Sequence, residues 1–298
     1  MCMCMPSVPK TSVVITCYNY GQYIRAAIES VLDQTWQDFE IIVIDDGSTD
    51  DTPQVMAEYN GHEKIRYLRQ ENQGQPKAKN RGIAESRGEF VAFLDADDVW
   101  LPEKLALQLQ LFNEPAVGVG YTRRYWIDPD GQVIQGNERT LRRGTILNYI
   151  FIDNFICFSS SMVRRELLDT IGGFDETLPM GIDYDLWIRL AAKCKFDFVD
   201  QPLIKYRTGH ANLSRNVTRR YQCAQLIMNK ALNDPEIRGK LSWYVARLAW
   251  ADTWSNMAGH LIRQGQYKDG LRYFSKAALM FPIYPNLWKR IIRCIVRR

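Results

Sequence analysis

The order of short apolar runs in the first hundred residues constrains the fold of this chain more than any other feature. Four such runs occupy residues 13–17, 41–44, 65–68 and 90–94. Each is short and rich in β-branched, aromatic or aliphatic side chains, which is typical of buried strands. Between them, apolar residues recur at the spacing of one helix face, as in Ile24, Ala27, Ile28, Val31 and Leu32. This alternation predicts an α/β fold, with a mostly parallel central sheet and helices on both faces.

Polar residues follow three of these predicted strands, at the point where each strand ends. They are residues 16–19, 45–46 and 95–98. In open sheets of this class, ligands bind beyond the carboxyl ends of the strands. We therefore expect the three groups to lie along one edge of the sheet and to form a binding site there.

The pair Asp95 and Asp97 has two interpretations when it is taken alone. Two carboxylates one residue apart suit Mg²⁺ or Mn²⁺, which also bind diphosphate oxygens. The same two acids can simply lie at a helix N-terminus, where the helix dipole stabilises negative charge. The position of the pair directly after an apolar strand makes the metal site as good an interpretation as the helix terminus.

Asp45, Asp46 and Tyr18 are also open to two interpretations. The acids can form an ordinary turn, or one of them can accept the N–H of a nucleotide base. Tyr18, at the end of the neighbouring strand, can stack on that base or belong to the core.

The remaining two thirds of the chain carry weaker patterns. Residues 117–127 and 155–163 are predicted to be strands, and residues 128–131 are predicted to form a hairpin turn. After residue 215 the pattern is helical: residues 266–280 have the apolar spacing of a helix, and residues 265–282 resemble half of a tetratricopeptide repeat. A single copy cannot form a solenoid, so we expect a helical appendage.

Composition limits the partners and the compartment. The net charge is +4, too small to indicate a nucleic-acid partner. The chain has seven scattered cysteines, no long apolar run and no secretory pattern at its start, so we expect reduced thiols and a cytoplasmic location. Residues 287–298 form a basic amphipathic stretch, which either packs on its own domain or lies on an anionic membrane. The second alternative places the protein at the inner face of the plasma membrane.

A series of short motifs occurs in a specific order along the chain. They are residues 16–19, 30–35, 45–49, 72–74, 79–82, 95–98, 172–176 and 183–187. In this order they resemble the family 2 glycosyltransferases, which are inverting enzymes with the Rossmann-like GT-A fold. The resemblance implies a GT-A domain over residues 10–215, with a nucleotide-sugar half at 10–113 and an acceptor half at 114–215. Residues 216–298 would form a C-terminal helical extension.

The resemblance also implies roles for individual residues. Thr16, Tyr18, Asp45, Asp46 and Lys79 would belong to the nucleotide-binding set. Asp95 and Asp97 would serve the ribose, the diphosphate and a Mn²⁺ or Mg²⁺ ion. His210 is a candidate further metal ligand, or an ordinary loop histidine. Asp183 would be the catalytic base, although its spacing also fits a helix cap.

Two positions depart from the family pattern, which often has Glu before the catalytic Asp and Arg in the fourth motif. Here these positions hold Ile182 and Lys79, and Lys keeps the charge without the bidentate fork of Arg. The expected activity is transfer of a sugar from a nucleotide-sugar, UDP-linked by default, to the hydroxyl of a glycan or lipid-linked acceptor. Polysaccharide, glycolipid or cell-envelope glycan synthesis would use such a reaction. Because of Ile182, the alternative is a non-catalytic subunit that binds nucleotide-sugars.

Overall fold

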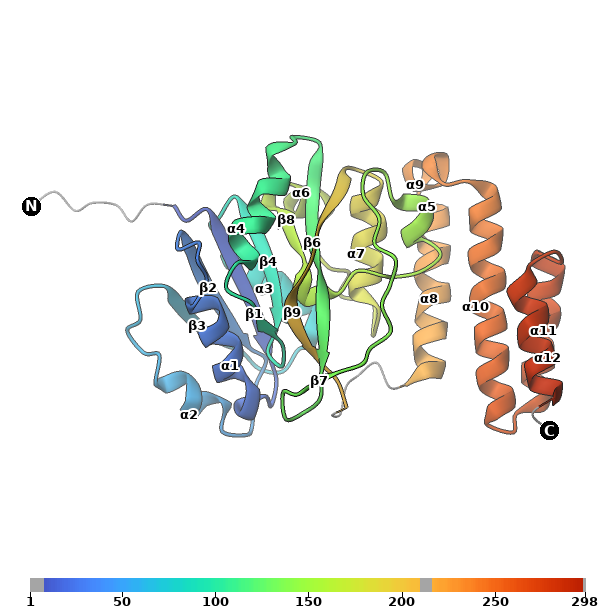
Figure 1. The fold of residues 1–298 in the computed structure, drawn as a ribbon, viewed down its shortest axis with the longest axis horizontal. Coiled ribbons are helices and arrows are strands. Elements are labelled where there is room, and N and C mark those ends of the chain that lie inside the picture. The colour runs from blue at the N-terminus through green and yellow to red at the C-terminus, as the bar shows by residue number, and fades with distance from the viewer. Residues whose placement is uncertain (1–7, 210–215, 297–298) are drawn as a thin grey trace, which may run out of the picture. The chain divides into compact units, whose positions relative to one another are not determined.

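The computed structural model describes residues 8–209 and 216–296 (Figure 1). The chain divides into two compact units. The sheet unit comprises the described residues of Met1–Gly144, Phe155–Glu176 and Lys193–His210. The helical unit comprises Thr145–Asn154, Thr177–Ala192 and the described residues of Ala211–Arg298.

The strands of the sheet unit form one mixed sheet. They are β1 (Thr11–Cys17), β2 (Phe39–Asp45), β3 (Ile65–Arg69), β4 (Phe90–Asp95), β5 (Val99–Trp100), β6 (Val117–Ile127), β7 (Val133–Ile134), β8 (Met162–Arg164) and β9 (Lys195–Arg207). Their spatial order is β3-β2-β1-β4-β8-β6-β9-β5, and β7 pairs with β6. The strands β1 to β4 are mutually parallel, as the apolar runs predicted. β8 is antiparallel to both β4 and β6, so β6 runs in the same direction as β4.

Helices cover both faces of the parallel half. The helical segments of the sheet unit are α1 (Gly21–Leu32), α2 (Thr52–Ala57), α3 (Gln75–Glu85), α4 (Lys104–Leu109), η1 (Gln110–Asn113), η2 (Phe158–Ser160) and α6 (Arg165–Ile171). Alternate residues of β2 point to opposite faces, so Ile41 packs in the core with α1 while Ile42 packs with Ala78 of α3. Continuous apolar strands are therefore buried on both sides, and the predicted α/β layering is confirmed.

The middle of the chain differs from expectation in two places. The prediction of a strand over 155–163 was wrong for most of its length, since the short helix η2 precedes a strand of only three residues, β8. The hydroxyls of Ser160 and Ser161 donate to the carbonyls of Cys157 and Phe158, which favours a tight turn over an extended strand. The long strand β9 was not predicted, because charged residues and Pro202 interrupt its apolar pattern.

The hairpin turn at 128–131 is confirmed and joins β6 to β7. The N–H of Gly131 donates to the carbonyl of Asp128 at 3.0 Å. Gly131 has a φ of 85°, a conformation that glycine adopts without strain.

The helical unit contains α5 (Leu147–Ile150), α7 (Ile182–Ala191), α8 (Val217–Asn233), α9 (Pro235–Lys240), α10 (Trp243–Arg263), α11 (Tyr267–Met280) and α12 (Pro285–Val296). The predicted helix near 266–280 is confirmed as α11. α10 and α11 lie side by side (Figure 1), and a Cβ on Gly270 would lie 2.5 Å from the Ile262 side chain, so glycine permits their close approach. None of the helices that the structure describes is both long enough and apolar enough to span a bilayer.

Candidate active site

The register of the sheet brings the polar strand ends together. Thr16 of β1 lies opposite Asp95 of β4, and Cys17 lies opposite Asp45 of β2. All three strands are parallel, so their carboxyl ends share one edge of the sheet. The expected convergence of the three polar groups is therefore present in the structure.

The carboxylate of Asp45 is fully buried, with 0% exposure, at the end of β2. One oxygen accepts the N–H of Ser48 at 2.8 Å, and the other accepts the hydroxyl of Tyr67 at 2.6 Å. Arg69 lies 3.6 Å from the same carboxylate. Burial, and then the hydrogen bond to Asp45, raise the pKa of Tyr67, so this phenol stays a donor at neutral pH.

Asp46, the next residue, organises the loop that leads into α3. One of its oxygens accepts the side-chain amide of Gln70 at 2.7 Å and the N–H of Gln73 at 2.9 Å. The other accepts the N–H of Gly74 at 2.8 Å. Asp45 and Asp46 thus connect the end of β2 to the segments around β3 and α3.

The loop after β1 is tied to the loop after β2. Asn19 has a φ of 60°, and its side-chain oxygen accepts the N–H of Thr49 at 2.7 Å. Its own N–H donates to the hydroxyl of Ser48 at 2.9 Å. Tyr18, beside it, is 45% exposed, so it is a surface aromatic at the edge of the sheet and not a core residue.

Lys79 reaches the same edge from α3 and is buried, and its ammonium lies 2.7 Å from an oxygen of Asp95. The ammonium also lies 3.5 Å from the centroid of the Phe158 ring, a geometry in which the ring face attracts a cation. The backbone N–H of Asp95 donates to the hydroxyl of Ser159 at 3.1 Å. These contacts hold the first acid of the Asp95–Asp97 pair in one position.

Asp98, for which we expected no individual role, is the buried centre of this acidic segment. Its carboxylate accepts the N–H of Arg207 at 2.8 Å and the hydroxyl of Ser159. Burial, and then the charges of Asp97 and Asp95, raise its pKa well above the ordinary range. Burial and the same acids also raise the pKa of Tyr20, so negative charge is concentrated at this edge.

Arg207 and Ser159 support this segment. Arg207, 6% exposed, donates through Nε to the carbonyl of Asp97 at 2.9 Å and through one terminal nitrogen to those of Asp128 and Pro129 at 3.1 and 2.7 Å. Arg207 reaches the acidic segment because β9 pairs with β5 and β6 in the folded sheet. No local sequence pattern indicated this role.

The other candidate residue, Asp183, belongs to the helical unit. It lies in the first turn of α7, and one of its oxygens accepts the side-chain amide of Asn154 at 2.8 Å. The N-cap of α7 is Gly181, with a φ of 75°, so the cap alternative for Asp183 does not hold. Ile182 is the first helical residue and is buried, at 5% exposure.

The residues expected to hold a metal give a mixed result. His210 lies outside the described residues. Within 8–209 and 216–296, no group of three or more His, Cys, Asp or Glu residues forms a metal cluster. Mg²⁺ and Mn²⁺ sites in nucleotide enzymes use one or two carboxylates plus substrate phosphates, so the half-buried Asp95 and Asp97 fit such an ion in donor chemistry.

Comparisons with known proteins agree on the family. A sequence profile of Glycosyl transferase family 2 matches residues 12–172. The chain is 32% identical over 227 residues to an uncharacterised glycosyltransferase of Rickettsia felis, covering 76% of this chain and 38% of that protein. It is 44% identical over 182 residues to one of Nostoc sp., covering 56% of this chain and 54% of that protein. The chain thus spans only part of the length of these relatives.

Two kinds of solved structure share the fold. S. aureus TarS 1–349 superposes with a TM-score of 0.65 at 18% identity, covering 93% of both chains, and it has also been solved with UDP and with UDP-GlcNAc. The mannosyltransferase PcManGT from Pyrobaculum calidifontis, solved with GDP-Man and Mn²⁺, gives 0.58 at 17% identity and covers 98% of this chain and 87% of that one. The profile match and the fold together confirm the resemblance seen in the sequence: the chain belongs to glycosyltransferase family 2 and has the GT-A fold.

Proposed function

We propose that this protein transfers a sugar from a nucleotide-sugar donor, by default a UDP-sugar, to an acceptor hydroxyl with inversion at the anomeric carbon. The observation that supports it most is the meeting of Thr16, Asp45 and Asp95 at adjacent carboxyl ends of parallel strands. Such an edge binds nucleotides in α/β folds. The nucleotides carried by the solved neighbours agree with this class of donor.

The nucleoside would bind at the ends of β1 and β2. Tyr18 is exposed there and can stack on the base. Asp45 and Asp46 lie next to it and would recognise the base N–H and the ribose. A carboxylate offers about four acceptor positions, and at Asp45 the Ser48 N–H and the Tyr67 hydroxyl use two, which leaves capacity for a base donor.

The diphosphate would bind at the acidic segment after β4. Asp95 and Asp97 would hold Mn²⁺ or Mg²⁺, which when bound neutralises the negative charge of the leaving nucleoside diphosphate. Lys79 already pairs with Asp95, so the segment keeps one fixed positive charge of its own. The hydrogen bonds of Arg207 and Ser159 fix the backbone of the segment before any ligand arrives.

Asp183 would act as the general base. Its carboxylate would take the proton of the acceptor hydroxyl while that oxygen bonds to the anomeric carbon and the bond to the nucleoside diphosphate breaks. A single displacement from the opposite face inverts the configuration. Asn154 donates to one oxygen of Asp183 and would orient the carboxylate for this step.

The C-terminal helix supports a second proposal, peripheral contact of a cytoplasmic enzyme with an anionic membrane that carries a lipid-linked acceptor. Ile283, just before α12, and Ile292, within it, are 75% and 58% exposed, and basic residues such as Lys289 lie between them in the sequence. Co-sedimentation with vesicles containing phosphatidylserine should fall for I283S/I292S. The control V133S alters an apolar residue of the sheet unit that is 61% exposed, and equal binding of all three proteins would contradict the membrane contact.

A donor screen tests the transferase activity. Wild type is incubated with UDP-, GDP- and dTDP-sugars, with and without Mn²⁺ or Mg²⁺ and with a panel of glycan acceptors, and release of nucleoside diphosphate is measured. Metal-dependent release from one donor, with a product of inverted anomeric configuration by NMR, is the expected result. Nucleotide binding without turnover of any donor would instead favour the non-catalytic subunit.

A further inference from the structure

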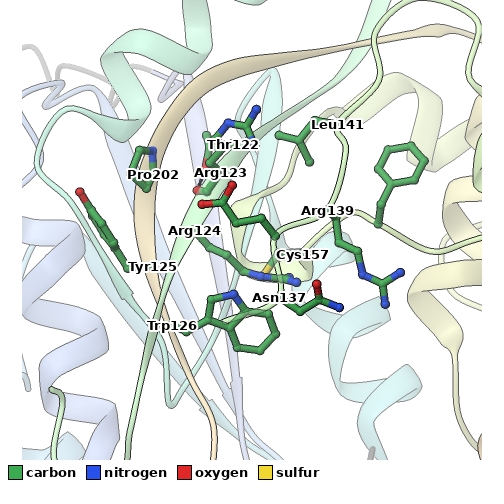
Figure 2. Close-up of a pocket in the computed structure, with 12 residues that line it drawn as sticks. Thr122, Arg123, Arg124, Tyr125, Trp126, Asn137, Arg139, Leu141, Cys157 and Pro202 are labelled. Carbon is green, nitrogen blue, oxygen red and sulfur yellow. Dashed lines mark hydrogen bonds between the residues drawn. The ribbon is translucent and has the colours of Figure 1, made fainter. Parts of the chain in front are cut away.

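A cavity of about 140 Å³ lies in the sheet unit, beside the carboxyl-terminal half of β6 (Figure 2). Its walls come from β6, from the loop that follows β7, and from Cys157 and Pro202. About 10–15 Å³ of such volume holds one water molecule, so the cavity has room for a carboxylate or phosphate group and part of its sugar. Three of its lining residues are arginines, Arg123, Arg124 and Arg139, against one acid, Glu138.

Arg124 differs from the neighbouring arginines in what balances its charge. Arg123 forms an ion pair with Asp200, and Arg143 forms one with Asp197. Among the residues that the structure describes, no carboxylate forms an ion pair with Arg124.

Aromatic rings hold the Arg124 guanidinium in place of an ion pair. Its central carbon, Cζ, lies 4.4 Å from the centroid of the Trp126 ring and 5.1 Å from the centroid of the Tyr206 ring. The Cys157 thiol also contacts it, but burial raises the pKa of this thiol to about 12, so the thiol is neutral at physiological pH and supplies no counter-charge. A guanidinium fixed on rings keeps its planar fork of donors, which matches a carboxylate or a phosphate.

The cavity wall is held rigidly around this cation. The rings of Trp126 and Tyr206 meet edge to face, with centroids 5.3 Å apart. Gly136 of the covering loop lies directly on the indole, since a Cβ there would come within 1.7 Å of Trp126. The position of Arg124 is therefore set by rings from two strands, one of which packs under the backbone of a loop, and it differs in this from a chance group of surface arginines.

The sheet also relates this cavity to the acidic segment. β6 runs in the same direction as β4, so the carboxyl-terminal half of β6, with Arg124 and Trp126, points to the same edge as Asp95. At that edge Ile127 pairs with Arg207, whose backbone N–H binds Asp98. A group bound at Arg124 would lie on the β6 side of the edge, away from the strands β1 and β2 that would hold the nucleoside.

We propose that this cavity binds an anionic group, a carboxylate or a phosphate, carried by the acceptor sugar, and that Arg124 is the residue that selects it. This inference rests on the proposed transferase function and names its acceptor class. Arg124 is a specificity-determining residue in this account and takes no part in the displacement itself.

Direct binding of small probes tests this proposal without turnover. Saturation-transfer NMR is recorded with glucuronate, glucose 1-phosphate and neutral glucose, first with UDP filling the donor site and then without it. We expect at least one anionic probe to bind, and comparison of the two anions separates a carboxylate from a phosphate site. R124Q should weaken its binding by roughly ten-fold or more, and R124K, which keeps the charge without the fork, by less.

Matched variants keep this test decisive. R25Q, which alters an exposed arginine paired with Glu58, should bind the probes as wild type does. E138Q should strengthen anion binding, because it removes the one acid of the cavity lining. Equal binding of glucose and the anions, no binding of any probe, or unchanged anion binding by R124Q would overturn the proposal. Failure of wild type to bind UDP would instead count against the transferase function. The two failures are distinguishable, because anion binding is also recorded without UDP.

Discussion

The acids of the sheet edge and Asp183 of the helical unit are held in different ways. Asp45 and Asp46 accept hydrogen bonds from β3 and from the loops that follow β2 and β3. Asp183 is held by Asn154, and its neighbour Asp185 pairs with Arg189 and with Lys230 of α8. The acids after β2 are thus held within the parallel half of the sheet, whereas the first turn of α7, which carries the proposed base, is also held by an ion pair from α8.

The largest expected effect is on turnover, and it separates the role of Asp183 from that of the nucleotide-binding edge. D183N should lower kcat by roughly 10²–10⁴-fold, because the amide cannot take the acceptor proton, while the affinity for nucleoside diphosphate stays unchanged. Steady-state kinetics and calorimetric titration of the same preparation measure both. The matched control D269N alters an exposed acid of α11 and should keep wild-type kcat. A D183N enzyme with normal kcat would remove Asp183 from the mechanism.

A second pair of variants compares packing in the two units. In G82A the added Cβ would lie 2.3 Å from Val14 of β1, so we expect the free energy of unfolding to fall by about 1–3 kcal/mol. In G239A of α9 nothing lies within 4 Å of the added Cβ. Alanine has the higher helix propensity, so the free energy of unfolding should stay the same or rise by up to about 1 kcal/mol. Urea unfolding measures both, and a G82A protein as stable as wild type would show that α3 packs less tightly than described.

The smallest expected effect is the pH dependence of the free energy of unfolding that Glu40 contributes. Burial alone would raise the pKa of Glu40, but hydrogen bonds from Arg87 and Ser12 outweigh it and lower the pKa below the ordinary value of 4.5. Because the folded pKa is the lower one, this carboxylate stabilises the fold above about pH 4.5, and the contribution is lost as pH falls through the folded pKa.

The variant E40Q should therefore be less stable than wild type by about 1 kcal/mol at pH 7, since Arg87 is half exposed and solvent weakens the pair. The difference should shrink as the pH is lowered below 4.5 in urea unfolding. E63Q, at an exposed acid, should show no such trend. A difference that grows toward acid pH would contradict the sign of the Glu40 shift.

The sequence predicted the polar edge of the sheet well, because this edge is determined by short apolar runs and the polar residues that directly follow them. The apolar runs located β1 to β4, and the parallel order then placed Thr16, Asp45 and Asp95 together. It did not predict β9 or the role of Arg207, because the 13-residue strand carries Pro202 and several charges and is stabilised mainly by its pairing with β6. Ser159 was read as an ordinary strand residue, and its bond to Asp98 depends on the unexpected turn at η2.

The domain limits and the roles of the site residues, including Asp183, remain predictions. The helix α7 illustrates why the limits are hard to read from sequence, since it lies inside the family motifs but packs with the C-terminal helices as part of the helical unit. Such grouping arises from contacts like that of Lys230 with Asp185, which join segments some 45 residues apart (230 − 185).

Calorimetric titration with UDP, GDP and dTDP, with Mn²⁺ present or absent, tests the central claim most directly. The account predicts that one nucleoside diphosphate binds wild type and D183N equally well, with an affinity that rises with Mn²⁺. In D97N this metal dependence should be lost. Failure of every nucleotide to bind wild type with metal present would contradict the assignment of the sheet edge as a nucleotide-sugar site.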